Sequence, residues 1–209
     1  MDQAAKKFED HLVWRQETLP IQLTDHMREL IVELGLSYTH GRDRSLRPIT
    51  FFQPVVVVGR DIILEESIMA THYVAQHLIE EMMVIGKVEN WVNVLDVAKL
   101  GLSSLPRSWI TAFIKSFSQN LYARSRIMFL VNCSTAVSII WSIVKVFVHW
   151  TVKQKMKFSK KNTDPLLQEM CHPSQLQKAY GGEAENVTHY WPPYYPSNEF
   201  GVDSSKIKK

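Results

Sequence analysis

Few residues in this chain are placed to do covalent chemistry. His72 and His77 lie five positions apart, a spacing that does not bring both onto one helical face to hold a metal ion. Asp96 follows an apolar run without a partner carboxylate or nucleophile nearby in sequence, so a structural cap is the better interpretation. Cys133 lies where a strand is expected to meet a helix, and a helix dipole there would favour its thiolate, but no base is assigned to it. The glycine-rich nucleotide motifs, the nucleophile elbow and the HExxH motif are absent, so we predict no enzyme, no metal and no cofactor.

A run of lysines is the strongest charged feature. Five lysines occur within nine residues, with no acid among them: Lys153, Lys155, Lys157, Lys160 and Lys161. Residues 1–100 hold 10 Lys and Arg against 15 Asp and Glu, whereas residues 101–209 hold 14 against 6. A basic half of this kind attracts phosphate, in nucleic acid or on an anionic membrane. The motifs of nucleic-acid-binding proteins are missing, so we predict transient contact with an anionic membrane surface and no nucleic-acid partner. The alternative is that the lysine run is an ordinary surface in contact with water and binds no partner.

The composition indicates one globular domain. Of the 209 residues 45% are hydrophobic and 11% aromatic, enough for a substantial core and unlike a disordered chain. Two cysteines cannot make a disulfide scaffold, which favours a reducing compartment. The first residues are polar and lack the apolar run of a secretory signal. We therefore expect a cytoplasmic protein that is peripherally associated with membranes.

Short apolar runs alternate with longer amphipathic segments after residue 48. Strands are predicted at residues 49–58, 91–95, 127–131 and 156–158. Helices are predicted at residues 64–84, 105–122 and 137–151, with a further helical turn from Asp164. Pro54 interrupts the first strand and indicates a sheet edge or a bulge, and Ser104 is the expected N-cap of the second helix. Strands that alternate with helices predict parallel βαβ units, and hence an α/β fold.

An uncharged stretch at residues 127–144 decides between two classes of protein. Its 18 residues approach the roughly 20 apolar residues that a transmembrane helix needs, so a single-span membrane protein is one alternative. Ser138, Ser142 and Lys145 nevertheless share one helical stripe, and apolar residues form the complementary stripe. We predict that the stretch folds as a strand, a turn and an amphipathic helix. The apolar side of this helix would then wall a cavity for a hydrophobic ligand.

Several motifs, in order along the chain, resemble those of the CRAL-TRIO lipid-binding family. The first are Trp14-Arg15 and the turn DRSLRPI at residues 43–49. The next are NVLD at residues 93–96, followed by GLS, and Arg124 followed by IMFLVN. Residues 141–155 and LQKAYGG at residues 176–182 complete the series. The resemblance implies a mixed, mostly parallel sheet with helices that enclose a hydrophobic cavity.

The resemblance also implies a division of the chain. We expect a short helical N-terminal segment over residues 1–40, which is a reduced form of the family's N-terminal unit. The lipid-binding lobe is expected over residues 41–182 and an extended C-terminal arm over residues 183–209. Leu46, Tyr122-Ala123 and Gln177 depart from the family pattern, which has Gly, Pro-Glu and Pro at these positions.

The function implied by the resemblance is the binding, and further the intermembrane transfer, of a phospholipid or other small hydrophobic ligand. The helix near residues 137–151 would gate the cavity. The ligand is expected to contact Arg15, Tyr73, Ser134, Ser138, Trp141 and Lys145. Gln16 replaces a lysine of the family's phosphoinositide pattern, so no head group is predicted. The alternative is a regulatory or scaffold module that keeps the fold and binds protein through the cavity region and the WPPYYP segment.

Overall fold

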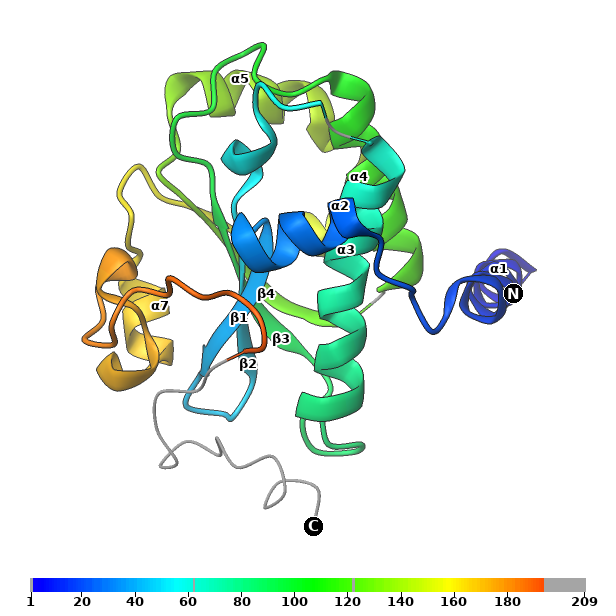
Figure 1. The fold of residues 1–209 in the computed structure, drawn as a ribbon, viewed down its shortest axis with the longest axis horizontal. Coiled ribbons are helices and arrows are strands. Elements are labelled where there is room, and N and C mark those ends of the chain that lie inside the picture. Colours follow the sequence, from blue (N-terminus) through cyan, green and yellow to red (C-terminus); the bar gives the residue numbers. More distant parts are fainter. Residues whose placement is uncertain (1, 62, 122, 194–209) are drawn as a thin grey trace.

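The computed structural model describes residues 2–61, 63–121 and 123–193, and a five-stranded sheet runs through it (Figure 1). The strands are β1 (Ser37–Arg42), β2 (Pro48–Phe52), β3 (Trp91–Asp96), β4 (Ser125–Val131) and β5 (Met156–Phe158), in the spatial order β1-β2-β3-β4-β5. β1 pairs with β2 antiparallel, and the other three pairs are parallel. The predicted mixed, mostly parallel α/β fold is confirmed.

Helices cover both faces of this sheet. The α-helices are α1 (Asp2–Thr18), α2 (Asp25–Arg28), α3 (Leu64–His77), α4 (Arg107–Asn120), α5 (Thr135–Val144), α6 (Trp150–Lys153) and α7 (Pro165–Met170). Short π or 3-10 segments are η1 (Glu29–Glu33), η2 (Pro54–Val57), η3 (Leu78–Met82), η4 (Lys145–Phe147), η5 (Pro173–Gln175) and η6 (Lys178–Tyr180). α3, α4 and α5 lie on one side of the sheet, and α7 lies on the other with the chain that follows it (Figure 1).

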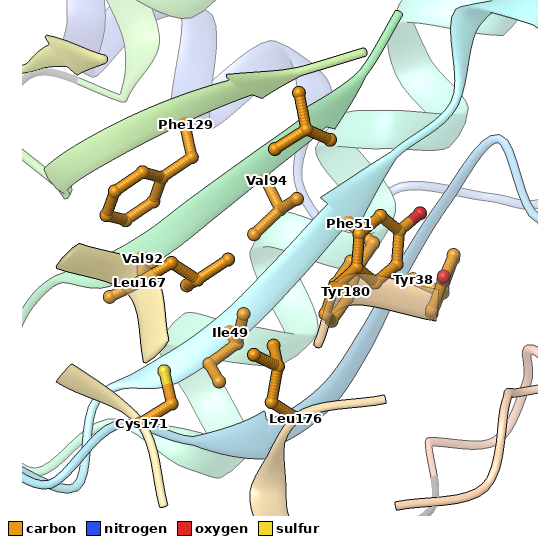
Figure 2. Packing of buried hydrophobic residues seen from close by; sticks show 11 residues of the cluster. Tyr38, Ile49, Phe51, Val92, Val94, Phe129, Leu167, Cys171, Leu176 and Tyr180 are labelled. Carbon is orange, nitrogen blue, oxygen red and sulfur yellow. The ribbon is translucent and has the colours of Figure 1, made fainter. Parts of the chain in front are cut away.

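Alternation along the strands gives the sheet two different faces, because successive side chains of a strand point to opposite sides. Phe51 points toward α7, where its ring lies 5.1 Å from that of Tyr38 and 4.9 Å from that of Tyr180 (Figure 2). The same face also buries Ile49, Val92, Val94, Phe129, Val131, Leu167, Cys171 and Leu176 (Figure 2). Thr50 and Asn93, which alternate with these residues, face α3 and α4. One face of the sheet is therefore closely packed, and the other face is available to line a site.

One strand prediction needs correction, and one strand was not predicted. The strand predicted over residues 49–58 ends at Phe52, and Pro54 begins η2 instead, because proline lacks the N–H that a strand donates. Strand β1 was not predicted, since its sequence SYTHGR is polar and contains a glycine. Gly41 is required there, because its φ is +70° and an added Cβ would lie 2.1 Å from the carbonyl oxygen of Gln175.

The predicted helices are present with shifted ends. The helix predicted over residues 64–84 is α3 followed by η3, and the one predicted over residues 105–122 is α4. Ser104 is not the N-cap of α4, since its Oγ accepts a hydrogen bond from the Gly101 N–H at 2.7 Å. The helix predicted over residues 137–151 is broken, because α5 ends at Val144 and α6 begins only at Trp150.

The uncharged stretch at residues 127–144 divides as predicted into strand, turn and helix. β4 ends at Val131, and Ser134 caps α5 by accepting a hydrogen bond from the Val137 N–H at 3.3 Å. Over the described ranges, no helix is both long enough and apolar enough to cross a membrane.

The two ends of the described chain pack on the helices of the cavity side: α1 lies against α4 and reaches His72 of α3, and the C-terminal segment lies against α3. The Trp14 ring of α1 lies 5.1 Å from the ring of His72, and the Trp191 ring lies 5.3 Å from that of Tyr73. β1 begins at Ser37, inside the segment that was assigned to the N-terminal unit. The described part of the predicted C-terminal arm packs on the body through Tyr190 and Trp191. Residues 194–209 of that arm lie outside the described residues, and the division into three parts stays a prediction.

Candidate functional site

A cavity of about 610 Å³ lies between the sheet and the helices α3, α4 and α5. Its floor is the second face of the sheet and includes Phe52, Leu95, Met128 and Leu130. Its walls include Val74 of α3, Trp109, Phe113 and Phe117 of α4, and Val137, Ile140, Trp141 and Val144 of α5. A concave site of this size with a mainly apolar lining suits a small hydrophobic ligand.

The amphipathic pattern of α5 turns its apolar stripe into one wall. Val137, Ile140, Trp141 and Val144 recur at offsets of 0, 3, 4 and 7, which is one face of a helix, and all four line the cavity. Continued along the same helix, the stripe would include Phe147 and Val148. Val148 does line the cavity, whereas the Phe147 side chain is 56% exposed. α5 ends at Val144 and η4 follows, so the 3.6-residue period does not continue through Phe147.

A hydrogen-bond network crosses the cavity floor near the amino ends of β3 and β4. Asn93 Oδ1 accepts a hydrogen bond from Trp91 Nε1 at 2.8 Å and lies 3.1 Å from the hydroxyl oxygen of Thr50. Asn93 Nδ2 donates to Ser125 Oγ at 2.8 Å, and Lys155 Nζ donates to the Ser125 carbonyl oxygen at 2.8 Å. These five residues line the cavity and give it a polar end. The floor near the carboxyl ends of the strands, at Leu95 and Leu130, is apolar.

Sequence reasoning missed most of this polar network. Thr50, Asn93 and Ser125 were not predicted to bind a ligand, although a signal was present. An asparagine in the middle of the apolar run WVNVL needs hydrogen-bond partners if the strand is buried, and a polar group on a buried strand indicates a constraint beyond packing.

The predicted ligand-contacting residues lie in different places. Trp141 lines the cavity, with its ring 5.2 Å from the ring of Phe158. Ser134 caps α5, and the exposed Ser138 donates its hydroxyl proton to the Ser134 carbonyl oxygen at 3.4 Å. The structure therefore brings Trp141 to the cavity, whereas the two serines interact with the first turn of their own helix.

The remaining three predicted contacts lie outside the cavity lining. Lys145 is exposed at the start of η4, and Arg15 is exposed on α1. Tyr73 faces Trp191 on the outer side of α3. For these three, as for Ser134 and Ser138, a lipid contact stays a prediction.

The lysine run is not one surface. Lys155 is partly buried and lines the cavity, whereas the other four, Lys153, Lys157, Lys160 and Lys161, are exposed. Lys155 precedes β5 and its ammonium reaches inward to Ser125, so the structure separates it from its neighbours in sequence.

Asp96 and Cys133 do not form a reactive pair. Asp96 accepts hydrogen bonds from the Ala98 N–H, from Asn132 Nδ2 and from the Tyr180 hydroxyl, which supports its interpretation as a structural cap. Burial raises the pKa of Cys133 above its ordinary value, against the expectation that the helix dipole favours the thiolate. No group of three or more His, Cys, Asp and Glu side chains that could hold a metal ion occurs within the part of the chain that the structure describes.

Two buried histidines make the stability of the fold depend on pH. Burial lowers the pKa of His72 and that of His40 from 6.5 to about 4. Between these values the unfolded chain binds protons that the folded protein does not, so stability rises with pH across this window and falls on acidification. Across the full window, each histidine is expected to raise the free energy of unfolding by about 3 kcal/mol as the pH increases.

Urea unfolding at a series of pH values from 4 to 7 measures this effect. In a His72→Phe variant, whose new ring can still stack on Phe117, the dependence of the unfolding free energy on pH is expected to become shallower. An unchanged slope in this variant would show that His72 is not the group responsible.

The fold and the cavity together define a class of protein: an α/β domain with a mainly apolar cavity between a mostly parallel sheet and its covering helices. Residues 33–182 match the family model for the CRAL/TRIO domain. That match covers more than half of the chain, and the chain therefore belongs to this family.

The fold also matches a solved structure, titled "Crystal structure of Sfh5", with a TM-score of 0.70. The two sequences are 13% identical, and the match covers 95% of this chain and 75% of that one. At this identity the likeness shows the fold alone. None of the curated proteins matches the sequence.

Proposed function

We propose that this protein binds a lipid or another small hydrophobic ligand in the cavity between the sheet and α3, α4 and α5. The observation that carries the proposal is the contrast between the two sheet faces: one is closely packed, and the other leaves about 610 Å³ behind mainly apolar side chains. Each methylene group of a ligand that leaves water for such a site contributes about 0.8 kcal/mol. The family of the chain, whose resemblance already implies lipid binding, supports the same function.

Native mass spectrometry of the protein purified from cells tests this proposal. We expect a fraction of the molecules to carry extra mass that organic solvent extracts as a lipid or similar hydrophobic molecule. Protein that is empty as purified, and that also takes up no hydrophobic probe when it is added, would contradict the proposal. Uptake by initially empty protein would still support it.

We further propose that the segment from α5 to α6 is the gate of the cavity and the surface that meets a membrane. Val144 and Val148 point into the cavity, whereas Val146, Phe147 and Trp150 between and beyond them are 71%, 56% and 60% exposed. Exposed apolar side chains grouped on one short segment are typical of a surface that enters a membrane interface. Opening of this broken helical segment would uncover the ligand at the membrane, which is the step that transfer requires.

The exposed lysines close to this segment support an anionic membrane as its partner. Lys145 belongs to η4, Lys153 ends α6, and Lys157, Lys160 and Lys161 follow shortly afterwards. Each basic residue near an anionic surface contributes about 1 kcal/mol to the free energy of membrane binding at physiological ionic strength. A protein that visits membranes in this way is consistent with the predicted cytoplasmic location and peripheral association.

A double variant, Phe147→Asp with Trp150→Asp, tests the membrane surface. Binding to vesicles of phosphatidylcholine and phosphatidylserine is expected to weaken about tenfold or more, since two apolar anchors are lost and two like charges face the lipid. Binding of a soluble fluorescent lipid probe should stay unchanged, because neither side chain lines the cavity.

The chain offers a matched control for this variant. Ile85 is 94% exposed and lies in the turn after η3, at the other end of the molecule from α5 (Figure 1). Ile85→Asp should leave vesicle binding as it is. Equal loss in both variants would mean that charge, and not the gate segment, controls the association, and no loss in either would remove the gate segment as the membrane surface.

A further inference from the structure

We infer that the ligand is a single-chain amphiphile with an ionised carboxylate head, such as a long-chain fatty acid, and that Lys155 and Ser125 bind this head. The inference rests on the proposed function and narrows it to one class of ligand. Three observations carry it: the volume of the cavity, the hydrogen-bonding capacity that its polar end leaves unused, and the charge of its lining.

The cavity holds one hydrocarbon chain. A volume of about 610 Å³ lies within the roughly 300 to 1,000 Å³ of sites that bind one small-molecule ligand. This corresponds to one long acyl chain with a small head group.

The polar end offers donors to a ligand. The Asn93 amide is saturated, since its oxygen accepts from Trp91 and Thr50 and its nitrogen donates to Ser125 Oγ and, at 3.4 Å, to the Ile127 carbonyl oxygen. Ser125 Oγ is therefore an acceptor toward Asn93, which leaves its own proton free to be donated.

Lys155 provides the second free donor. One of its three ammonium protons is directed to the Ser125 carbonyl oxygen, and the structure shows no hydrogen bond for the other two among the described residues. A head group that only accepts hydrogen bonds matches this pair of donors. A carboxylate does so with both of its oxygens.

The charge of the lining also favours an anion. Lys155 is the only charged side chain among the described residues that line the cavity, and no Asp or Glu opposes it there. An ammonium group beside an apolar chamber attracts an anion more strongly than it would in water, because the effective dielectric constant is lower. Hydrogen bonds to an ionised group are also about twice as strong as those between neutral groups.

The orientation of the ligand follows from where the two ends of the cavity lie. With its carboxylate at Ser125 and Lys155, the chain would run along the floor toward Leu95 and Leu130 and pass between α4 and α5. The end of the chain would then meet Val97, Leu100 and Val137, which form an apolar cluster at the carboxyl ends of the strands.

Competition binding with the delipidated full chain tests this inference. A fluorescent 18-carbon polyene carboxylate serves as the probe, and the competitors are saturated carboxylates of increasing length, the alcohols of the same length, and a phosphatidylcholine with two long chains. We expect the 16- to 18-carbon carboxylates to compete best, at about tenfold lower concentration than the matching alcohols, which is the difference that one hydrogen bond to a charged group makes.

Lys155→Met keeps most of the length of the side chain and removes its charge. It is expected to weaken carboxylate binding about tenfold and to leave the binding of the alcohol unchanged. The matched control is Lys157→Met, two residues along the chain, whose exposed side chain is not part of the cavity lining. The comparison of acid with alcohol on the unaltered protein needs no variant and so does not depend on how Lys155→Met folds.

The outcomes separate this inference from the proposed function. Equal binding of acid and alcohol, an undiminished carboxylate affinity in Lys155→Met, or stronger competition by the phosphatidylcholine would overturn the single-chain carboxylate and leave lipid binding in place. If no probe and no competitor binds and the purified protein is also empty, the proposed function itself fails.

Discussion

Met128→Trp is expected to weaken binding of a hydrophobic ligand about 100-fold or more, since an indole in the cavity would displace about four methylene groups at about 0.8 kcal/mol each. Met128 lies on β4 in the middle of the cavity floor, between Asn93 on β3 and Met156 on β5. Its side chain lines the cavity and belongs to none of the closely packed clusters. The indole ring of a tryptophan at this position would therefore enter space that a ligand would use.

A titration with a fluorescent lipid probe measures this loss, and a thermal melt of the empty protein measures the fold. The melting temperature is expected to change little, because the new ring meets apolar walls and does not have to displace packed side chains. Met128→Leu, which nearly conserves the volume, is the matched control and should bind the probe like the unaltered protein. Unaltered affinity in Met128→Trp would mean that the ligand binds somewhere else.

Of the variants proposed here, Phe51→Ala is expected to lower the stability most, by about 3 to 5 kcal/mol in the free energy of unfolding. The Phe51 side chain is fully buried on the closely packed face of the sheet, between the rings of Tyr38 and Tyr180 (Figure 2). Its removal leaves a void that these rings cannot fill, and the loss is a large part of the roughly 5 to 15 kcal/mol that stabilises a typical domain.

The next residue of the same strand provides the comparison for urea unfolding. Phe52 points to the cavity face, where its ring lies 4.6 Å from that of Phe113 and its side chain is only partly buried. Phe52→Ala should therefore lower the free energy of unfolding by less than Phe51→Ala does. If the two variants cost the same, the contrast between a packed face and a hollow face, on which the cavity depends, would be wrong.

Much of the sheet could be predicted because its strands have a local signature. Strands covered on both faces are mainly apolar runs, and the predictions at residues 91–95 and 127–131 agree with β3 and β4. The prediction at residues 156–158 also agrees with β5, although this edge strand contains the exposed Lys157. β1 lacks this signature, since Thr39, His40 and Gly41 interrupt any apolar pattern. The strand is buried because β2, α3 and the segment around Gln175 cover it. A strand whose burial comes from distant residues is not visible in its own sequence.

The candidate site was predictable as a cavity but not as a set of contacts. The complementary stripes on residues 137–144 predicted that one face of α5 would wall a pocket, and the structure places Val137, Trp141 and Val144 there. Of the residues predicted to contact a ligand, Trp141 alone lines the cavity; the serines of α5 lie on its exposed side. A helical pattern shows which residues share a face. Which serine or lysine reaches a ligand depends on the strands and helices that form the other walls of the cavity.

The sequence by itself determined three features: the α/β class, the separation of the uncharged stretch into strand, turn and helix, and the inward face of that helix. These follow from periods of two and 3.6 residues, which are visible along a single segment. Only the tertiary structure decided that Thr50, Asn93, Ser125 and Lys155 form one polar end. Their contacts depend on the register of β2, β3 and β4 and on where β5 begins, and register is set by pairing between segments some 30 to 40 residues apart. For the same reason, Lys155 lines the cavity while Lys153 and Lys157 remain exposed.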